Sequence, residues 1–478
     1  MHLNTETFVQ NSEAATQNEK LQSRLRVLSS FTLKRDRAFA ELSGGEALRD
    51  RARAIKQETI ANLDRYLIQL EESITRLGGK VHWARNAEEA RSIILDLARA
   101  GHVKRVVKSK SMATEEIELN EALEHAGIEA VETDLGEYIV QIADEKPSHI
   151  LAPAIHKSKG DVADLFAQKL GELNLREPEE MAAVARRQLR EKFCTAEMGI
   201  TGANFAVAET GTIVLVENEG NIRLSTTLPR IHVALVGIEK VIPRLADLAV
   251  FLKVLARSAT GQKMSAYVSF ITGTRRAGES DGAREFHLVL LDNGRTRILE
   301  DEEKRESLYC LRCGACLNAC PVYQKIGGHA YGSVYQGPIG SIITPPLIGL
   351  GKSKDLPFAS SLCGACREVC PVKINIPHVL LNLRSDWVEG KARSETGARK
   401  GPSIVERAAI RLWAFAMRHP SIYKLTFRLA AKLQGPLLKD GKLDSLPFAF
   451  SGWTINRDFP PLAEKDFRSL WREIEKDV

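Results

Sequence analysis

The sequence lacks the features that would place this chain in a membrane or outside the cell. Glu6 and Glu13 interrupt its first residues, whereas a secretory signal begins with basic residues and continues into an apolar run. No uninterrupted apolar stretch approaches the roughly 20 residues that a membrane-spanning helix needs. We therefore expect a cytoplasmic protein.

Nucleotide-binding fingerprints and a strong net charge are also missing. Neither GxGxxG nor GxxxxGK[ST] occurs, so we assign no flavin, NAD or ATP to this chain, although a partner can carry a flavin. The 67 Lys and Arg residues nearly balance the 61 Asp and Glu residues, leaving a formal charge of +6. Attraction to nucleic acid would need local patches, and we predict no nucleic-acid partner.

The composition excludes a disordered or fibrous chain. Of the 478 residues, 44% are hydrophobic and 27% are charged, which is the usual range for soluble globular domains. The length exceeds the roughly 100 to 200 residues of one domain, so the sequence predicts two or three domains.

The first half of the sequence alternates between helical and extended patterns. Apolar residues recur at helical spacing over residues 37–77, and Gly78 and Gly79 end that pattern. Short apolar runs then alternate with amphipathic segments, which is typical of a parallel open sheet. The pattern predicts strands at 81–84, 103–108 and 128–132, with helices from 86 and over 112–123.

The next segment predicts a hairpin followed by more mixed structure. Two apolar runs, Thr212–Val216 and Ile222–Ser225, flank a polar turn at residues 217–221 that contains Gly220 and Asn221. Further strands are expected at 233–236 and 286–291, with a helix over 241–255. We therefore expect one mixed α/β domain over residues 37–299.

Seven of the eight cysteines lie between residues 310 and 370. In a reducing cytosol, clustered cysteines are metal ligands more often than disulfides. The first motif is CxxCxxCxxxCP, and its cysteines are Cys310, Cys313, Cys316 and Cys320. This spacing is the ferredoxin signature of 4Fe-4S clusters, in which the fourth cysteine binds the neighbouring cluster.

The second motif repeats the first with its leading cysteine replaced by Ser360. Its cysteines are Cys363, Cys366 and Cys370, followed by Pro371. With crossed connectivity, Cys310, Cys313, Cys316 and Cys370 bind one 4Fe-4S cluster, and Cys320, Cys363 and Cys366 bind the other. The second cluster is then either 3Fe-4S or a 4Fe-4S cluster with an oxygen or exogenous fourth ligand. Ser360 is the nearest candidate, and Ser361 lies beside it.

Two simpler interpretations compete with this one. Zinc also binds cysteine quartets at CxxC spacing, but it does not explain two motifs that both end in CxxxCP. The eighth cysteine, Cys194, stands alone in KFCTAEMGI, and we expect a packed core thiol there.

These boundaries define four segments. We expect an N-terminal extension over residues 1–36, the α/β domain over 37–299 and two 4Fe-4S ferredoxin-type motifs over 300–399. A basic helical region then occupies residues 400–478.

Long strings in both halves resemble the lactate utilization protein B family. In the α/β half the resemblance rests on KSKSMATEEIELNEALE at 108–124, ETDLGEYIVQ at 132–141, PSHILAPAIHK at 147–157 and AVAETGTIVLVENEGNIR at 206–223. In the second half it rests on SLCGACREVCPVKINIP at 361–377 and on GWTINRDFPPLAEKDFRSLW at 452–471. The α/β half resembles the LUD domain, which implies a sheet of the sugar-isomerase and CoA-transferase type. The second half resembles an α-helical dicluster ferredoxin module with a helical tail.

The resemblance implies a function in electron transfer. It implies the iron-sulfur subunit of an NAD-independent L-lactate dehydrogenase complex, in which three companion proteins oxidise L-lactate to pyruvate. The motif with three cysteines is normal for this family. Two alternatives stay open: the LUD domain itself oxidises a 2-hydroxy acid, or an incompletely ligated cluster senses oxygen or iron. The sequence assigns no catalytic residue.

The α/β half is rich in side chains suited to acid-base or anion chemistry. These are Lys108, Lys110, Glu115, Glu116, Asn120, Glu132, Asp134, Glu137, His149 and His156. His156 and Lys157 together suit a base and a carboxylate anchor, although hydrogen-bonded surface histidines are commoner. A second set, Glu209, Thr210, Glu217, Glu219 and Asn221, suits either a pocket or a solvated hairpin turn. Gly273, Arg275 and Arg276 form a weak candidate anion loop.

The basic tail predicts a contact surface. On a helix, Arg407, Arg411 and Arg418 share one face, and Ile410, Trp413 and Met417 share a neighbouring one. Such a helix docks on an acidic partner or on the inner, anionic face of the membrane. The alternative is an ordinary amphipathic helix packed on the ferredoxin module.

Overall fold

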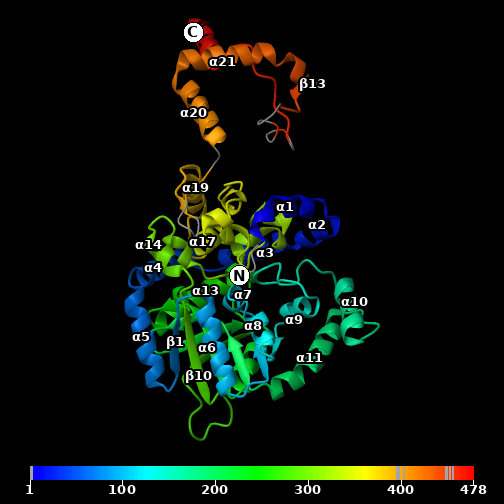
Figure 1. Cartoon of the computed structure of the whole chain (residues 1–478), viewed down its shortest axis with the longest axis vertical. Helices are drawn as coiled ribbons and strands as arrows, with labels where there is room; N and C mark the ends of the chain where they lie inside the picture. Colours follow the sequence, from blue (N-terminus) through cyan, green and yellow to red (C-terminus); the bar gives the residue numbers. More distant parts are fainter. Residues whose placement is uncertain are drawn as a thin grey trace. The chain divides into compact units, whose positions relative to one another are not determined.

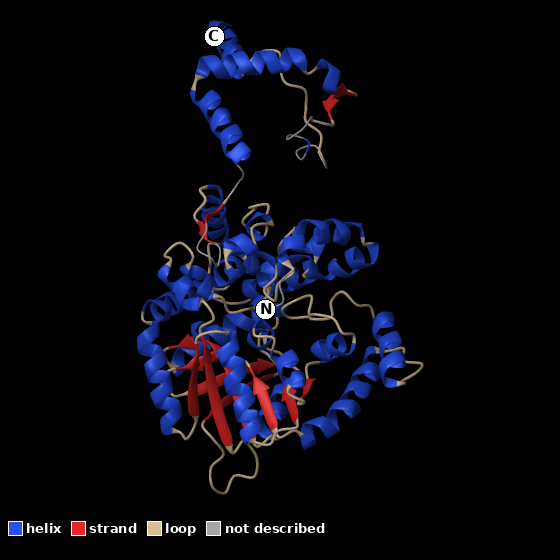
Figure 2. Cartoon of the chain, viewed as in Figure 1, coloured by secondary structure: helices blue, strands red, loops and turns tan. Residues whose placement is uncertain are grey.

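The computed structural model describes residues 4–393, 399–401, 404–446, 451, 454 and 457–477. The chain divides into two units, Met1–Lys400 and Gly401–Val478. Figure 1 follows the chain through both units, and Figure 2 shows the strands of the first unit enclosed by helices. Within the described residues, no helix is long and apolar enough to span a membrane.

A six-stranded sheet with all strands parallel lies at the centre of the first unit. Its order is β1-β10-β7-β4-β2-β3. The strands are β1 (Lys80–Ala84), β2 (Arg105–Lys108), β3 (Glu129–Glu132), β4 (Met198–Thr201), β7 (Ile231–Gly237) and β10 (Glu285–Leu291). The predicted parallel sheet is therefore confirmed.

Both faces of this sheet are buried because its side chains alternate between two cores. Ile231, Val233 and Leu235 of β7 pack with α6 (Ala87–Ala100) and α8 (Leu119–His125). Ala234 and Val236 of the same strand belong to the core on the opposite face. A second sheet, of order β8-β5-β6-β9, contributes to that core. The helices α4 (Gly45–Ala61), α5 (Leu63–Arg76) and α13 (Leu245–Thr260) pack there as well.

The predicted hairpin at residues 212–225 is wrong. Residues 222–225 lie in α12 (Asn221–Thr227), because the carboxylate of Glu217 accepts the N–H groups of Ile222 (2.8 Å) and Arg223 (3.1 Å) and caps that helix. Strand β6 pairs antiparallel with β5 and β9 instead. The strands of this sheet are β5 (Phe205–Val207), β6 (Thr212–Glu217), β8 (Val241–Ile242) and β9 (Tyr267–Thr272).

The predicted single helix over residues 37–77 is also wrong. The range contains the end of α3 (Val27–Ala40) and two further helices, which follow a break at Gly44, whose φ of 69° favours glycine, and are separated from each other at Asn62. Within the described residues, three α-helices begin before residue 37, so residues 8–36 are largely helical. The N-terminal helices are α1 (Phe8–Gln17), α2 (Glu19–Leu25), α3 (Val27–Ala40), α4 (Gly45–Ala61) and α5 (Leu63–Arg76).

Further helices complete the first unit. The helix predicted over 112–123 is split at Glu118, which has a φ of 54°. The α/β region contains α7 (Met112–Glu116), α9 (Leu135–Ile142), α10 (Lys159–Leu170), α11 (Pro178–Thr195) and α14 (Arg295–Glu300). The cysteine-rich region contains α15 (Ala315–Asn318), α16 (Tyr323–Ile326), α17 (Gly337–Ile348), α18 (Ala365–Glu368) and α19 (Ile376–Val388).

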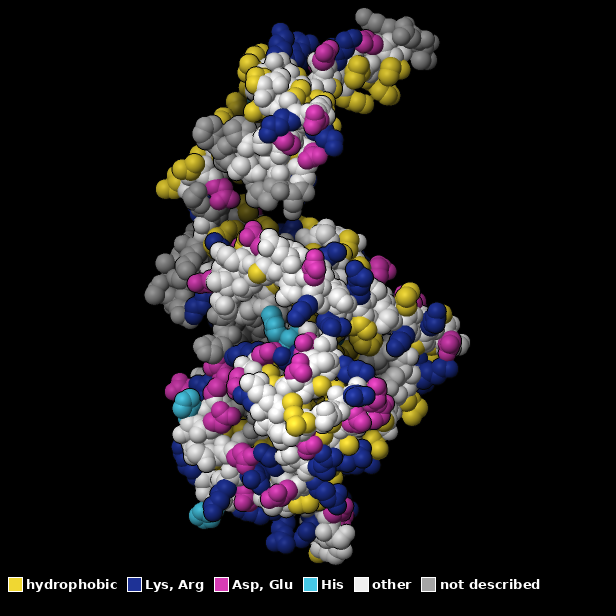
Figure 3. Space-filling model, turned by 90° about the vertical axis from the view of Figure 1, so that its right-hand side faces the viewer, with side chains coloured by type: hydrophobic (Ala, Val, Ile, Leu, Met, Phe, Trp, Pro, Cys, Tyr) yellow, Lys and Arg dark blue, Asp and Glu magenta, His cyan; other side chains and the backbone are white. Residues whose placement is uncertain are grey.

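The second unit exposes many apolar side chains. Its helices are α20 (Ile404–Arg418), α21 (Pro420–Leu433) and α22 (Phe467–Asp477). No described residue of α20 or α21 is buried, and Trp413 is 61% exposed. Figure 3 shows apolar side chains gathered on the C-terminal helices, whereas basic and acidic side chains are mixed over the rest of the visible face. Docking of α20 on a partner, a membrane or the ferredoxin module stays a prediction.

Candidate metal centre and the adjoining cavity

Four thiols from both cysteine motifs line one small cavity. They belong to Cys310, Cys313, Cys316 and Cys370. Ile339, Ile374 and Ile376 supply apolar parts of the wall. Backbone N–H groups also donate to sulfur, from Arg312 to Cys310 Sγ (3.3 Å) and from Ile374 to Cys370 Sγ (3.4 Å). The structure thus brings together the crossed set of cysteines, and their role as ligands stays a prediction.

The chemistry of this thiol group fits a metal cluster. Burial, followed by the neighbouring thiolates of Cys310 and Cys370, raises the pKa of Cys313 to about 12. Burial also raises the pKa of Cys370 to about 11. Thiolates packed this closely need a compensating positive charge, which a coordinated metal provides. The donor set therefore fits the iron-sulfur cluster predicted from the motif.

The other three cysteines form a second group beside the first. Cys320 and Cys366 are buried, whereas Cys363 is exposed. Burial, followed by the thiolates of Cys320 and Cys363, raises the pKa of Cys366 to about 12. The Cys366 thiolate also contributes to the raised pKa of Cys316. The two groups therefore adjoin.

Ser360 occupies the place in the second motif that Cys310 occupies in the first. The Leu362 N–H donates to Ser360 Oγ (3.1 Å), as the Arg312 N–H donates to Cys310 Sγ (3.3 Å). The backbone follows the same left-handed path in both motifs. Positive φ angles occur at Arg312 (61°) and Gly314 (72°), and again at Leu362 (56°) and Gly364 (86°). Ser360 Oγ therefore has the same place in its loop as Cys310 Sγ has in the first.

Arginines from the N-terminal helices hold the second motif, which sequence analysis missed. Buried Arg35 donates to the carbonyl oxygen of Val369 (3.2 Å). Buried Arg49 donates twice to the carbonyl oxygen of Cys370, at 2.8 and 3.2 Å. These partners are more than 300 residues apart in the chain. No local sequence pattern predicts these contacts.

The expectation that Cys194 is a core thiol is wrong, because this side chain is exposed. It lies near the end of α11 directly after Phe193, which is buried at 7% exposure. Successive side chains on a helix point in directions about 100° apart. With Phe193 in the core, Cys194 therefore faces outward.

A second cavity, of about 310 Å³, opens where the parallel strands end and reaches the first cysteine loop. We call it the sheet-edge cavity. After β2, β3, β4, β7 and β10 the chain contributes Lys110, Asp134, Asn204, Lys240 and Arg295 to its wall, in that order. Glu217, Glu219, Asn221, Glu239, Arg312 and Tyr335 also line it. Sequence analysis singled out five of these residues without placing them together: Lys110, Asp134, Glu217, Glu219 and Asn221.

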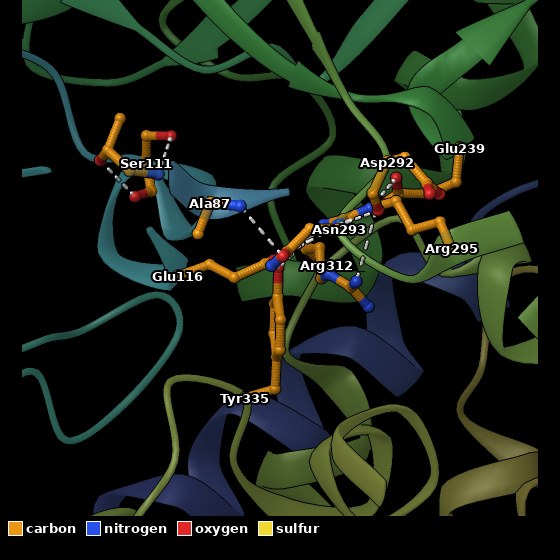
Figure 4. A network of polar contacts seen from close by, with 10 residues as sticks. Ala87, Ser111, Glu116, Glu239, Asp292, Asn293, Arg295, Arg312 and Tyr335 are labelled. Atoms are coloured by element: carbon orange, nitrogen blue, oxygen red, sulfur yellow. Dashed lines mark hydrogen bonds and ion pairs between the residues drawn. The ribbon is translucent and has the colours of Figure 1, made fainter. Parts of the chain in front are cut away.

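A buried ion network forms one wall of the sheet-edge cavity (Figure 4). Arg295, whose side chain is 1% exposed, donates to Glu116 Oε2 (2.8 Å) and to Glu239 Oε2 (2.6 Å). The Tyr335 hydroxyl donates to the same Glu116 oxygen. Burial alone would raise the pKa of Glu239, but the charges of Arg295 and Arg312 hold it at about 2. Arg295 is therefore the central cation of this wall.

A separate cavity, of about 560 Å³, contains several other predicted acid-base residues. The buried Lys108 ammonium lies 2.6 Å from Glu132 Oε1, which also accepts from Asn120 Nδ2 (2.8 Å). Burial raises the pKa of Glu115 to about 7. Burial and the charges of Glu115 and Glu132 raise the pKa of Glu137 well above its usual value. These carboxyl groups can hold protons near neutral pH.

The two candidate histidines have structural contacts. His149 Nδ1 accepts the N–H of Leu151 (3.0 Å), and His149 Nε2 lies 3.0 Å from Asn318 Oδ1. Burial lowers the pKa of His149 to about 3, so it is neutral. His156 Nε2 and Lys157 Nζ each lie 2.6 Å from a carboxylate oxygen of Glu145. The suggested base and carboxylate anchor are therefore paired with one acidic residue.

The remaining candidates belong to turns and helix ends. Glu209 Oε2 accepts the N–H of Leu245 (2.9 Å) at the start of α13. Thr210 donates to Thr212 (2.8 Å). In the loop after Gly273, the Arg276 N–H donates to Glu279 Oε2 (2.7 Å), and the Arg275 N–H donates to a backbone carbonyl. These contacts are structural.

The fold and the two thiol groups define an iron-sulfur protein built on an α/β domain. Three families match consecutive parts of the chain: the LUD domain at residues 67–291, the 4Fe-4S dicluster domain at 306–374, and the C-terminal domain of lactate utilisation protein B at 382–476. The dicluster match favours iron-sulfur clusters over zinc. The chain belongs to the lactate utilization protein B family.

Full-length relatives establish this membership. Lactate utilization protein B of Bacillus licheniformis is 43% identical over 100% of this chain and 98% of the relative. The protein of the same name from Geobacillus sp. strain WCH70 is 44% identical over 98% and 95%. A crystal structure of a DUF162 family protein from Deinococcus radiodurans is 16% identical, covers 48% of this chain and 98% of that chain, and superposes with a TM-score of only 0.26.

Proposed function

We propose that this chain carries electrons during the oxidation of L-lactate to pyruvate, together with companion proteins of an NAD-independent lactate dehydrogenase system. The main observation behind this proposal is that the seven thiols form two adjoining groups, one of four and one of three. Its support comes from relatives named for lactate utilization and from the match to a 4Fe-4S dicluster domain. When bound, two such clusters supply one-electron transfer.

The proposed ligands follow the grouping of the thiols. Cys310, Cys313, Cys316 and Cys370 hold the first cluster, and Cys320, Cys363, Cys366 and Ser360 hold the second. Ser360 is included because its oxygen accepts the Leu362 N–H in the same way that Cys310 Sγ accepts the Arg312 N–H. We also propose that the sheet of the α/β domain is of the sugar-isomerase and CoA-transferase type.

The chain's own residues give the two groups different surroundings. Ile339 and Ile374 exclude water from the first group, which adjoins the sheet-edge cavity at Arg312. In the second group Cys363 is exposed. We therefore expect a partner to exchange electrons on the Cys363 side. The exposed arginines and apolar residues of α20 are a second docking surface, for an acidic partner or the inner face of the membrane.

The test is the reduction of the clusters by lactate. The full chain, purified without oxygen, should show reduced-cluster EPR signals after L-lactate is added with the companion proteins, but not with the chain alone. Reduction by L-lactate in the chain alone would instead support a 2-hydroxy-acid oxidoreductase. If lactate plus companions leaves the clusters oxidised while dithionite reduces them, the proposal is wrong.

Replacing Ser360 by alanine tests the oxygen ligand. We expect Ser360→Ala to lower iron from about eight to about seven atoms per chain and to produce an EPR signal of an oxidised three-iron cluster. Ser360→Cys should keep about eight irons and shift the EPR signals of the second cluster. Ser361→Ala is the matched control, because it removes the neighbouring hydroxyl, which hydrogen-bonds the Cys363 thiol but does not occupy the motif position of Ser360; it should leave about eight irons per chain. Identical iron and spectra in Ser360→Ala and the unmodified chain would rule out Ser360 as a ligand.

A further inference from the structure

We propose that the sheet-edge cavity binds a small monocarboxylate with a hydroxyl or oxo group at carbon 2, whose carboxylate lies between Arg312 and Lys240. This inference rests on the proposed function for the identity of the ligand. The site itself rests on the geometry of the cavity.

The cavity lies where parallel α/β sheets bind ligands. After β2 the chain adds β3 on one side of the sheet, and after β4 it adds β7 and β10 on the other. The switch point therefore lies between β2 and β4, and residues that follow both strands, Lys110 and Gly202, line the cavity. Ligands of open α/β sheets bind outside the carboxyl ends of the strands at such a point.

Arg312 supplies an unsatisfied guanidinium group. Its side chain is only 8% exposed, yet neither terminal nitrogen makes a hydrogen bond within the described residues. The guanidinium group stacks on Tyr335, 4.4 Å from the ring centre. Glu239 Oε1 lies 3.5 Å from Arg312 Nη2, so the two side chains form an ion pair without a hydrogen bond. A buried guanidinium without hydrogen bonds is costly, and its planar fork matches a carboxylate.

Lys240 adds a second cation on the same wall. It lines the cavity, and its ammonium group makes no hydrogen bond within the described part of the chain. Burial, followed by the charge of Arg312, lowers the pKa of Lys240 to about 8. The carboxylates of Glu116 and Glu239 are already held by Arg295. Arg312 and Lys240 therefore have nearby negative charges in Glu239 and Cys310 but, among the described residues, no hydrogen-bonding partner for their terminal nitrogens, and an anionic ligand can supply one.

Acidic side chains in the lining favour a ligand with one negative charge. Asp134, Glu217 and Glu219 lie near Lys110 in this lining, and their net negative charge would repel a second carboxylate or a phosphate. Burial raises the pKa of Glu217, and burial with the charge of Asp134 raises that of Glu219. Both oxygens of Glu217 already accept backbone N–H groups, so Glu219 is the carboxyl group that suits a hydrogen bond to the hydroxyl or oxo oxygen. The volume of about 310 Å³ fits a small organic acid.

Gly237 lets the ion network pack against the end of β7. A Cβ atom at Gly237 would lie 2.2 Å from Glu239 Oε2 and 2.7 Å from Arg295 Nε. The side chains of the ion network therefore pack directly against the backbone that ends β7. Arg312 also lines the cavity of the first thiol group, so a bound carboxylate would lie next to that group.

Calorimetric titration of the full chain, purified without oxygen, tests the site directly. We expect saturable binding of L-lactate or pyruvate, with a small change in the EPR signal of the first cluster. Lys240→Met should weaken this binding at least about tenfold, because a charge-assisted contact is lost. Arg312→Gln should weaken it at least as much, with iron content measured because Arg312 lies between two cysteines. Lys253→Met, which changes an exposed lysine of α13, should bind like the unmodified chain.

Three results would overturn the inference. These are no binding of either acid at millimolar concentration, unchanged affinity in both Lys240→Met and Arg312→Gln, and inorganic phosphate or succinate binding as tightly as the monocarboxylates. None of them bears on the proposed function if lactate plus companions still reduces the clusters. Conversely, binding without such reduction would support the site and contradict the electron-carrier function.

Discussion

Cys370→Ala is expected to convert the cluster of the first motif to a three-iron cluster, although Cys370 belongs to the second motif. The structure places its thiol on the cavity that Cys310, Cys313 and Cys316 line, and loss of one of four thiolates leaves an iron without its ligand. Iron should fall from about eight to about seven atoms per chain, because the iron that loses its thiolate leaves the cluster. The measurement is iron and acid-labile sulfide analysis with EPR of the reduced protein.

The EPR signal that stays unchanged shows which cluster kept its ligands. In Cys370→Ala, the signal that Ser360→Ala alters should stay unchanged. In Cys320→Ala, that signal should change and the signal of the other cluster should stay unchanged. Cys194→Ala is the matched control, because Cys194 is exposed and lies outside both groups. If Cys370→Ala changed the Ser360-sensitive signal, each motif would bind its own cluster and the crossed ligand assignment would be wrong.

Local patterns in the sequence predict the central sheet well. Apolar runs such as 233–236 and 286–291 lie in β7 and β10, because buried parallel strands are apolar on both faces. The same patterns fail where a single side chain determines the local conformation of the backbone. Residues 222–225 have strand-like composition, yet the Glu217 carboxylate caps a helix there. At Gly44, backbone conformation breaks a pattern that otherwise reads as one helix.

The sequence predicts the part of the candidate site whose residues lie at a characteristic spacing along the chain. The cysteine motifs identify the seven thiols and single out Ser360. The neighbours of these thiols come from distant segments, such as Arg49 beside Cys370, and no sequence spacing encodes that contact. The sheet-edge cavity is a similar case. Its cationic end combines the end of β7, the start of α14 and the first cysteine loop, which only the folded chain brings together.

Arg295→Met should destabilise the chain strongly. This arginine is 1% exposed and neutralises both Glu116 and Glu239, so its removal leaves two buried carboxylates with little compensation. Breaking a buried ion pair in this way costs about 3–5 kcal/mol. Urea unfolding of the full chain, followed by tryptophan fluorescence under anaerobic conditions, measures the change in the free energy of unfolding.

A charge-neutralising second substitution separates the electrostatic effect from lost packing. Glu116→Gln in the Arg295→Met background should recover part of the loss, because it removes one of the two uncompensated charges. Arg85→Met is the control, because Arg85 forms an ion pair with Glu89 while its side chain is 87% exposed. Exposed ion pairs contribute about 0–1 kcal/mol to the free energy of unfolding. Equal losses in Arg295→Met with and without Glu116→Gln would show that arginine packing, rather than charge, stabilises the wall between the sheet and the first cysteine loop.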